Sequence, residues 1–281
     1  MGAPLLVFGQ TGQLARALAR LVDDAITIPR ATFDLAADPA ECRQTLNLLI
    51  DRYRPRGVIN AAAYTHVDRA ESERALAFRI NAETPALIAQ TCARETIPFV
   101  HISTDYVFDG DQTRPWREDD PTKPMNVYGQ SKLAGELGVQ DAGGQATILR
   151  TSWVYDLFGR NFVTTMLRLA EDTSQLRVVD DQIGRPTHAN VLAMSALAAL
   201  GQSGLFHVSG TGDPVSWAGF ASEIFRFAKW DIQVTPVPSS EYPTAATRPS
   251  YSVLDVSKFE QTLAPLPDWR KTLRQAINQR G

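Results

Sequence analysis

The chain has 281 residues, of which 44% are hydrophobic and 21% charged, and its formal net charge is −3. This length and apolar content allow a full hydrophobic core in one large domain or two smaller ones. The absence of a basic excess argues against nonspecific nucleic-acid binding and against attachment to an anionic membrane surface. Any anionic ligand must therefore be held by a local site.

Cysteine and histidine are few and scattered along the chain. Cys42 and Cys92 lie in helix-like contexts without a metal-binding spacing, so we expect two structural thiols in a reducing compartment. No histidine has a second ligand at a usual spacing, so the sequence predicts no metal site. No segment approaches the roughly 18 to 20 apolar residues that span a membrane, and the first apolar run is too short for a secretory signal. We expect a cytoplasmic protein without a membrane partner.

The first half alternates short apolar runs with amphipathic stretches. Strand-like runs occur at 4–9, 25–29, 57–63, 97–103 and 145–152. Helix-like stretches occur at 13–22, 39–55, 83–95 and from 127 onward. This alternation predicts an α/β fold, a Rossmann-like doubly wound parallel sheet with helices on both faces. Ligands of such folds bind beyond the carboxyl ends of the strands.

The second half is less regular and richer in proline. Helices are predicted at 159–172, 189–202, 216–230 and 267–279, a strand at 204–210, and a turn-rich segment at 236–250. We expect a smaller C-terminal substrate-binding lobe, formed by 151–186 and 211–281, over the carboxyl edge of the sheet. The dinucleotide-binding domain would then comprise 1–150 together with roughly 187–210.

A glycine-rich turn, GQTGQLA at 9–15, joins the first strand to the first helix. Glycines there let the backbone turn tightly and approach a pyrophosphate, whose charge is met by the helix N-terminus. Within a βαβ unit this turn favours dinucleotide binding over a plain strand–helix connection. The candidate cofactor contacts are Gly9, Gln10, Thr11 and Gly12.

The end of the second strand commonly distinguishes the two nicotinamide dinucleotides. An acidic residue there binds a ribose diol, whereas a cation accepts a 2′-phosphate. Arg30 lies close to this strand end with no acid immediately before it, which favours NADPH over NADH, although a solvated loop arginine fits nearly as well. Asp34 and Leu35 can flank the adenine.

Two further strand ends face the same predicted crevice. Ala61, Ala62 and Ala63 give a flat surface against which a nucleotide can lie, or they merely permit tight helix–sheet packing. Ser103 and Thr104 end the next strand, where hydroxyl groups can form a turn or face the nicotinamide. The small side chains alone do not decide between these roles.

Tyr128 and Lys132 stand four residues apart in VYGQSKLAGE, a spacing that places both on one helical face. With the Thr104 hydroxyl they would form a proton-delivery set at the nicotinamide. We expect the ammonium to lower the pKa of the phenol from its free value of about 10. General acids of this kind contribute roughly 10² to 10⁴ in rate.

Six motifs occur in order: the glycine-rich turn, NAAA, STDYVF, YGQSKLAGE, RTSWVY and DDQIGRPT, followed by RPSYSVLD and LPDW. Together they resemble the extended short-chain dehydrogenase/reductase superfamily, and within it the dTDP-4-dehydrorhamnose reductase family, from Leu5 to the final helix. The resemblance implies NADPH- or NADH-dependent reduction of the C4 ketone of dTDP-4-dehydro-L-rhamnose to dTDP-L-rhamnose, the last step of dTDP-rhamnose biosynthesis.

The resemblance also implies residue roles. Tyr128 would protonate the C4 oxygen, Lys132 would bind the nicotinamide ribose hydroxyls, and Thr104 would hydrogen-bond the reacting oxygen. The positions that match cofactor contacts are Gly12, Gln13, Leu14, Asp34, Leu35, Ala63, Tyr64 and Thr65. The positions that match the substrate wall are Val67, Asp105, Tyr106 and Trp153. Trp153 either stacks on the substrate or simply packs in the protein. Arg248 is a candidate partner of the dTDP pyrophosphate, or else an ordinary surface arginine.

Departures from the family pattern bear on assembly and on alternatives. Some members dimerise through magnesium held by glutamates, but Ala17 and Asn190 at two matching positions supply no carboxylate. We therefore expect no metal, and a monomer or a metal-independent homodimer. A 4,6-dehydratase would need an acid where Tyr106 stands. Another nucleotide-sugar 4-ketoreductase, a 4-epimerase or a noncatalytic NADP-binding regulatory subunit remain alternatives.

Overall fold

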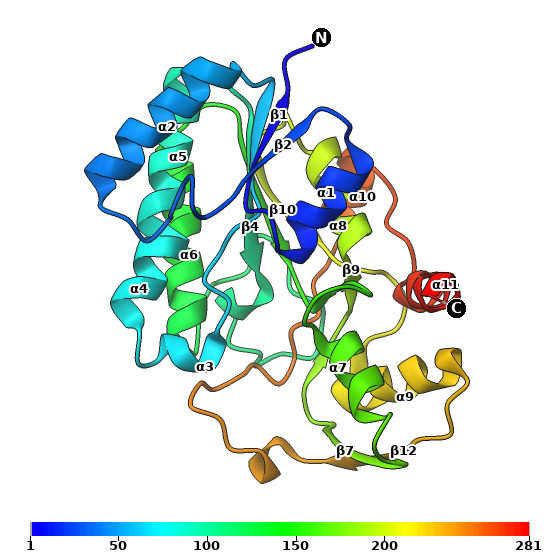
Figure 1. The fold of residues 1–281 in the computed structure, drawn as a ribbon. Coiled ribbons are helices and arrows are strands. Elements are labelled where there is room, and N and C mark those ends of the chain that lie inside the picture. The colour runs from blue at the N-terminus through cyan, green and yellow to red at the C-terminus, as the bar shows by residue number, and fades with distance from the viewer. Residues whose placement is uncertain (1, 281) are drawn as a thin grey trace.

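A six-stranded parallel sheet forms the centre of the computed structural model, which describes residues 2–280 (Figure 1). The strands are β1 Leu5–Phe8, β2 Ala25–Ile28, β3 Gly57–Asn60, β4 Phe99–Thr104, β5 Ala146–Thr151 and β10 Gly204–Val208. Their order is β10-β5-β4-β3-β1-β2. Because the chain passes from β1 to β2 on one side and then crosses to β3 on the other, the topological switch point lies between β1 and β3. The predicted doubly wound sheet is confirmed.

Helices cover both faces of this sheet. The helices on one face are α2 Pro39–Tyr53, α5 Thr84–Arg94 and α6 Val127–Asp141, and those on the other are α1 Gln13–Leu21 and α8 Ala189–Ala198 (Figure 1). Between β3 and α5 the chain forms α3 Val67–Ala70, α4 Arg74–Phe78 and the π-helix η1 Arg79–Glu83. All residues of β1 and β3 are buried, as expected for strands with a helical layer on each face.

A smaller lobe lies beyond the carboxyl ends of the strands (Figure 1). Its elements are β6 Val154–Tyr155, α7 Phe162–Leu169, β7 Gln175–Val179, β8 Ile183–Gly184, β9 Thr187–His188, β11 Val215–Ser216, α9 Trp217–Ala228, β12 Gln233–Val237, η3 Ser239–Glu241, α10 Ser257–Thr262 and α11 Trp269–Arg280. The lobe has its own hydrophobic core, in which Phe220 and Trp269 are fully buried. α10 is the exception, because it packs beside β10 on the sheet.

The segment 244–256 connects the lobe to the strand ends. Asn126 Nδ2 donates to the Thr247 carbonyl oxygen at 2.7 Å, and Trp116 Nε1 donates to that of Tyr251 at 2.9 Å. The Ile183 amide donates to the Ser250 carbonyl oxygen at 2.8 Å. These bonds hold the segment against both parts of the molecule. Within residues 2–280, no helix is long and apolar enough to cross a membrane.

Candidate active site

The glycine-rich turn lies at the switch point. Gly9 has a φ of +109°, and a Cβ atom there would lie 3.4 Å from the backbone of Ala61 and Ala62. Gly12 forms the N-cap of α1, whose first turn contains no acidic side chain. A glycine at position 9 is therefore favoured by its backbone conformation, in a turn that packs against the loop after β3. The result is an open helix N-terminus beside a flat alanine backbone, an arrangement suited to a pyrophosphate.

Other predicted cofactor contacts surround this turn. Gln10 and Thr11 are exposed, while Gln13 Nε2 donates to the Val154 carbonyl oxygen at 3.1 Å and so joins α1 to the lobe. Gln13 Oε1 is buried and has no hydrogen-bond partner among the described residues. Leu14 is buried beneath the turn.

At the end of β2, Arg30 and Asp34 form an exposed ion pair of 3.1 Å. The Arg30 side chain is 76% exposed, so its remaining N–H groups face solvent. Leu35 is buried, and its carbonyl oxygen accepts a bond of 2.8 Å from Thr84 at the start of α5. This geometry places a cation at the position predicted for a 2′-phosphate, and that assignment stays a prediction.

A buried asparagine joins the loop after β3 to the helix that bears Tyr128. Asn81, in the π-helix η1, accepts a bond of 2.8 Å from the Tyr64 amide and donates to the Tyr64 carbonyl oxygen at 3.1 Å. It also donates to Ser131 Oγ at 2.9 Å, and Ser131 donates to the carbonyl oxygen of Tyr128. Asn81 and Ser131 therefore position two predicted contact segments relative to each other. Sequence reasoning missed both residues.

Two features place the N-terminus of α6. The Asn126 side chain caps the helix by accepting from the Gly129 amide at 2.8 Å. A Cβ atom on Gly129 would clash with the carbonyl oxygen of Tyr106 in the 3₁₀ helix η2, Asp105–Val107. Glycine at this position thus lets α6 approach the end of β4. Its presence inside a helical pattern was the available signal for a close contact.

Thr104 and Lys132 are buried, and Tyr128 is half-buried, where α6 approaches the end of β4. Burial raises the pKa of Tyr128 to about 12, and the neighbouring Thr104 side chain partly opposes this. The expectation that Lys132 lowers this pKa is wrong for this structure, because burial dominates and Lys132 Nζ donates instead to the Ile102 carbonyl oxygen at 2.5 Å. At neutral pH the phenol therefore carries its proton and can donate it.

Lys132 itself is buried, which lowers its pKa to about 8, while the nearby Glu136 acts in the opposite direction. Its Nζ lies 3.3 Å from His101 Nε2. His101 Nδ1 lies 3.3 Å from Asn60 Nδ2, and the oxygen of that amide accepts from the Ala62 amide at 3.2 Å. A continuous polar chain therefore runs from Lys132 to the alanine loop, and sequence reasoning had missed His101 and Asn60.

The candidate substrate wall adjoins Tyr128. The Tyr106 ring lies edge-on to that of Tyr128, with centroids 5.8 Å apart. Asp105 is buried, which raises its pKa to about 6, and its Oδ2 has no partner among the described residues. Arg248 bonds both oxygens of Asp68 in α3, at 3.1 and 2.7 Å. Beside Asp68, Val67 is half-buried at the start of α3, while Ala63 and Thr65 are exposed in the loop before it.

Trp153 stacks on Trp217, with ring centroids 3.4 Å apart and planes at 6°. Its φ of +48° is unusual for a bulky side chain. A Cβ atom on Gly184 would clash with the Trp153 ring, so a glycine is required beneath the stack. The stack therefore holds a strained residue in place where the lobe begins.

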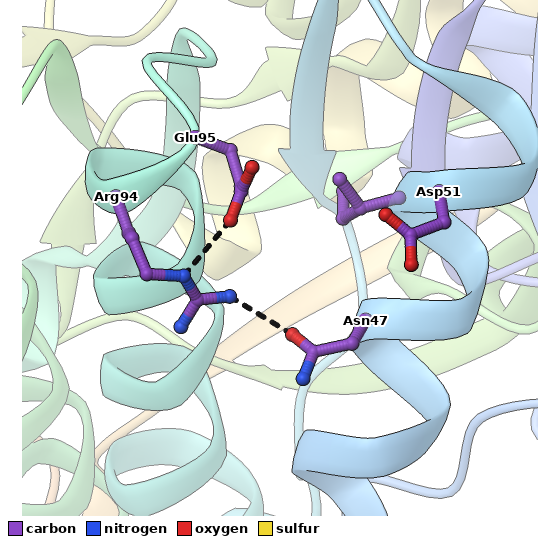
Figure 2. Close-up of a pocket in the computed structure, with 5 residues that line it drawn as sticks. Asn47, Asp51, Arg94 and Glu95 are labelled. Carbon is purple, nitrogen blue, oxygen red and sulfur yellow. Dashed lines mark hydrogen bonds and ion pairs between the residues drawn. The ribbon is translucent and has the colours of Figure 1, made fainter.

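Two surface hollows lie away from these residues. Figure 2 shows the first, of about 240 Å³, where Arg94 bridges Glu95 and Asn47 beside Asp51. Because α2 and α5 run antiparallel to the strands, their C-terminal ends place this hollow on the amino side of the sheet. The second, of about 290 Å³, lies between 117–119 and 255–262. Neither contains a predicted site residue, so the assignment rests on the strand ends.

The positions associated with a bridging metal carry other contacts. Ala17 is fully buried, and Asn190 Oδ1 accepts from Arg20 at 3.1 Å. Across residues 2–280, no group of three or more His, Cys, Asp or Glu side chains is placed to hold a metal ion.

Comparison with known proteins gives a consistent assignment. The family model described as the RmlD substrate binding domain matches residues 3–281. A dTDP-4-dehydrorhamnose reductase of Sinorhizobium fredii is 41% identical over 290 residues, covering 97% of this chain and 96% of that protein. Crystal structures of dTDP-4-dehydrorhamnose reductases from Clostridium acetobutylicum (35% identical, TM-score 0.92, 98% and 99% of the chains) and from Bacillus anthracis in complex with NADP (34%, 0.92, 99% and 100%) are also similar. The chain therefore belongs to the RmlD substrate binding domain family, that of the dTDP-4-dehydrorhamnose reductases.

Proposed function

We propose that the protein reduces the C4 ketone of dTDP-4-dehydro-L-rhamnose to dTDP-L-rhamnose with NADPH, or NADH, as hydride donor. The observation that carries this proposal is the group formed by buried Thr104, buried Lys132 and half-buried Tyr128 at the carboxyl end of β4, in a sheet whose switch point bears a glycine-rich turn. Membership of the family supports the substrate, and the NADP complex of the Bacillus anthracis relative supports the cofactor.

The residues around the switch point fit a dinucleotide. The turn at Gly9–Gly12 would hold the pyrophosphate, the backbone of Ala61–Ala63 would lie against the nucleotide, and Arg30 would meet a 2′-phosphate. When bound, the reduced nicotinamide supplies the hydride. Asp34 and Leu35 would border the adenine, and Lys132 would hold ribose hydroxyls.

Tyr128 would give its proton to the C4 oxygen as negative charge develops there, and the Thr104 hydroxyl would orient the same oxygen. The raised pKa of Tyr128 keeps its proton available at neutral pH. Asp105, Tyr106, Val67 and Trp153 would line the sugar and base. For Arg248 to bind the pyrophosphate, it would exchange at least one of its bonds to Asp68.

We propose a cytoplasmic enzyme that binds neither nucleic acid nor membrane and acts as a monomer or a metal-independent homodimer. Sedimentation with and without EDTA checks the assembly. Loss of a dimer on chelation would refute metal independence.

The function is tested by NADPH oxidation, followed by absorbance, with dTDP-4-dehydro-L-rhamnose generated in situ. Stoichiometric NADPH loss and formation of dTDP-L-rhamnose, identified by NMR, are expected. A 4-epimerase would interconvert sugars without net NADPH consumption, and a regulatory subunit would leave the cofactor unchanged. Either result would rule out the proposed reaction.

A further inference from the structure

The hydrogen-bonded groups Lys132, His101, Asn60 and Ala62 form a series in which the position of each proton can be worked out. The Ala62 amide donates to Asn60 Oδ1 at 3.2 Å, which fixes the orientation of that amide group. The Asn60 NH₂ group therefore faces His101 Nδ1, 3.3 Å away, and can only donate to it. His101 Nδ1 is thus the acceptor of the pair.

The imidazole of His101 is neutral, because full burial holds its pKa well below the usual range. A neutral imidazole carries one N–H donor and one acceptor nitrogen. With Nδ1 accepting from Asn60, the proton resides on Nε2, which points at Lys132 Nζ at 3.3 Å. An ammonium has no acceptor site, whereas a neutral amine can accept this N–H while donating to Ile102 O.

If Lys132 is charged, two hydrogen-bond donors face each other at one point of this series, with no acceptor between them. If His101 carries its proton on Nδ1 in order to accept from the ammonium, two donors meet at Asn60. If the Asn60 amide rotates to relieve this, two donors meet at the Ala62 N–H instead. An unsatisfied buried donor costs roughly 1–3 kcal/mol. The neutral amine is therefore the state in which all four groups are paired.

Other charged groups surround α6, but they are not the cause of the preference for the neutral amine of Lys132. Of these, Glu136 favours the ammonium, and it is bound by Arg150 through two hydrogen bonds of 2.9 and 2.7 Å. The ionisable residues on elements packed against α6 are Asp68, Arg69, Arg74, Arg79, Glu83, Cys92, Arg94, His101, Asp105, Tyr106 and Arg150, and Tyr128, Glu136 and Asp141 lie on α6 itself.

We propose that Asn60 and His101 act as positioning residues that stabilise the neutral amine of Lys132 in the cofactor-free protein, so that dinucleotide binding takes up a proton there. The second part rests on the proposed function, in which ribose hydroxyl oxygens accept from the Lys132 ammonium. The proton comes from solvent and converts –NH₂ to –NH₃⁺. The alanine loop at 61–63, a candidate cofactor contact, is thereby linked to the charge of Lys132.

The first part is tested without any ligand. Nitrogen-15 NMR of the imidazoles at pH 9 is expected to show His101 with its proton on Nε2. His207 is the matched control, since its Nδ1 lies 3.0 Å from the Trp116 carbonyl oxygen and so carries the proton. In Asn60→Asp the carboxylate accepts from Nδ1, so the His101 proton should move to Nδ1 while His207 stays unchanged. A proton on Nδ1 of His101 in the free wild-type protein would overturn the inference.

The second part is tested by calorimetry of NADPH binding in buffers of different ionisation enthalpy. Because the pKa of Lys132 is lowered, the wild-type protein should take up more proton on binding NADPH at pH 9 than at pH 7. Asn60→Asp should take up less at pH 9. Equal uptake in the two proteins, or none in the wild type, would contradict the coupling. Failure of NADPH to bind would count against the proposed function, while the NMR result would still decide the tautomer.

Discussion

At the residue scale, the Asp105 carboxyl group is a buried acid among the candidate substrate contacts. It is buried beside Thr104, which donates to its Oδ1 at 3.0 Å, and burial is the main cause of its raised pKa of about 6. The group binds a proton more tightly in the folded than in the unfolded chain. The free energy of unfolding therefore falls as pH rises from about 4 to about 6, by roughly 3 kcal/mol in all.

Asp105→Asn should remove this contribution, because asparagine resembles the protonated carboxyl group and does not ionise. We expect urea unfolding at pH 4, 5, 6 and 7 to show a smaller loss of stability with rising pH than the wild type shows. Asp51→Asn, at an exposed position in Figure 2, is the control and should retain the wild-type slope. An unchanged slope in Asp105→Asn would show that the carboxyl group is not perturbed.

Spacing and motif order were enough to predict that Tyr128 and Lys132 share a helical face near Thr104. They were not enough to predict the direction of the pKa of Tyr128, because burial depends on the whole fold. The partners Asn60, Asn81 and His101 were missed for a related reason. Their bonds join residues 17 to 50 positions apart, and no local pattern reports such contacts.

At the scale of elements, α6 and the π-helix η1 form the support of the site. Asn81 satisfies both backbone groups of Tyr64 and the hydroxyl of Ser131 inside the protein. A Cβ atom on Gly135 would clash with the Asn81 carbonyl oxygen, so the two helices touch through backbone. π-Helical turns often occur at functional sites, and here the turn aims Asn81 at the loop after β3.

Asn81→Ala should lower the free energy of unfolding by about 2–4 kcal/mol, because it leaves the buried N–H and C=O groups of Tyr64 without partners. Chemical denaturation measures this loss. Asn47→Ala removes a half-buried asparagine whose exposed hydrogen bond is to Arg94 in Figure 2, and should change stability by less than about 0.5 kcal/mol. Equal effects of the two substitutions would contradict the supporting role of Asn81.

Most helices and sheet strands were predictable because their hydrophobic periodicity is strong. The parallel pair of β7 and β12 was not predicted, and β12 ends inside the segment expected to be turn-rich. Its residues are mostly exposed and include Pro236, so the pattern lacks the buried alternation of a typical strand. The π-helix also has no sequence signature in Arg79–Glu83.

At the scale of the whole molecule, a buried ion pair joins the sheet to the helical layer and to the loop at 108–118. Arg150 in β5 bonds both carboxylate oxygens of Glu136 in α6, and Ser103 donates to the same carboxylate. The Arg150 guanidinium also lies 5.0 Å from the centroid of the Phe108 ring.

The assignment of 187–210 to the first domain stays a prediction, which the position of β10 beside β5 supports.

Arg150→Met should lower the free energy of unfolding by about 3–5 kcal/mol, because it leaves the Glu136 carboxylate buried without its counter-charge. The double variant Arg150→Met with Glu136→Leu should recover most of this loss. Arg226→Met, which breaks the exposed pair with Glu223, should cost less than about 1 kcal/mol. A double variant no more stable than Arg150→Met would contradict this account of the pair.

The most direct test of the central claim compares kcat/KM of wild type and Tyr128→Phe in NADPH-dependent reduction of dTDP-4-dehydro-L-rhamnose. Loss of the proton donor should lower kcat/KM by about 10² to 10⁴ while NADPH still binds. Tyr242→Phe, at an exposed tyrosine of the lobe, should keep wild-type activity. A Tyr128→Phe enzyme as active as wild type would contradict the assignment of Tyr128 as the proton donor.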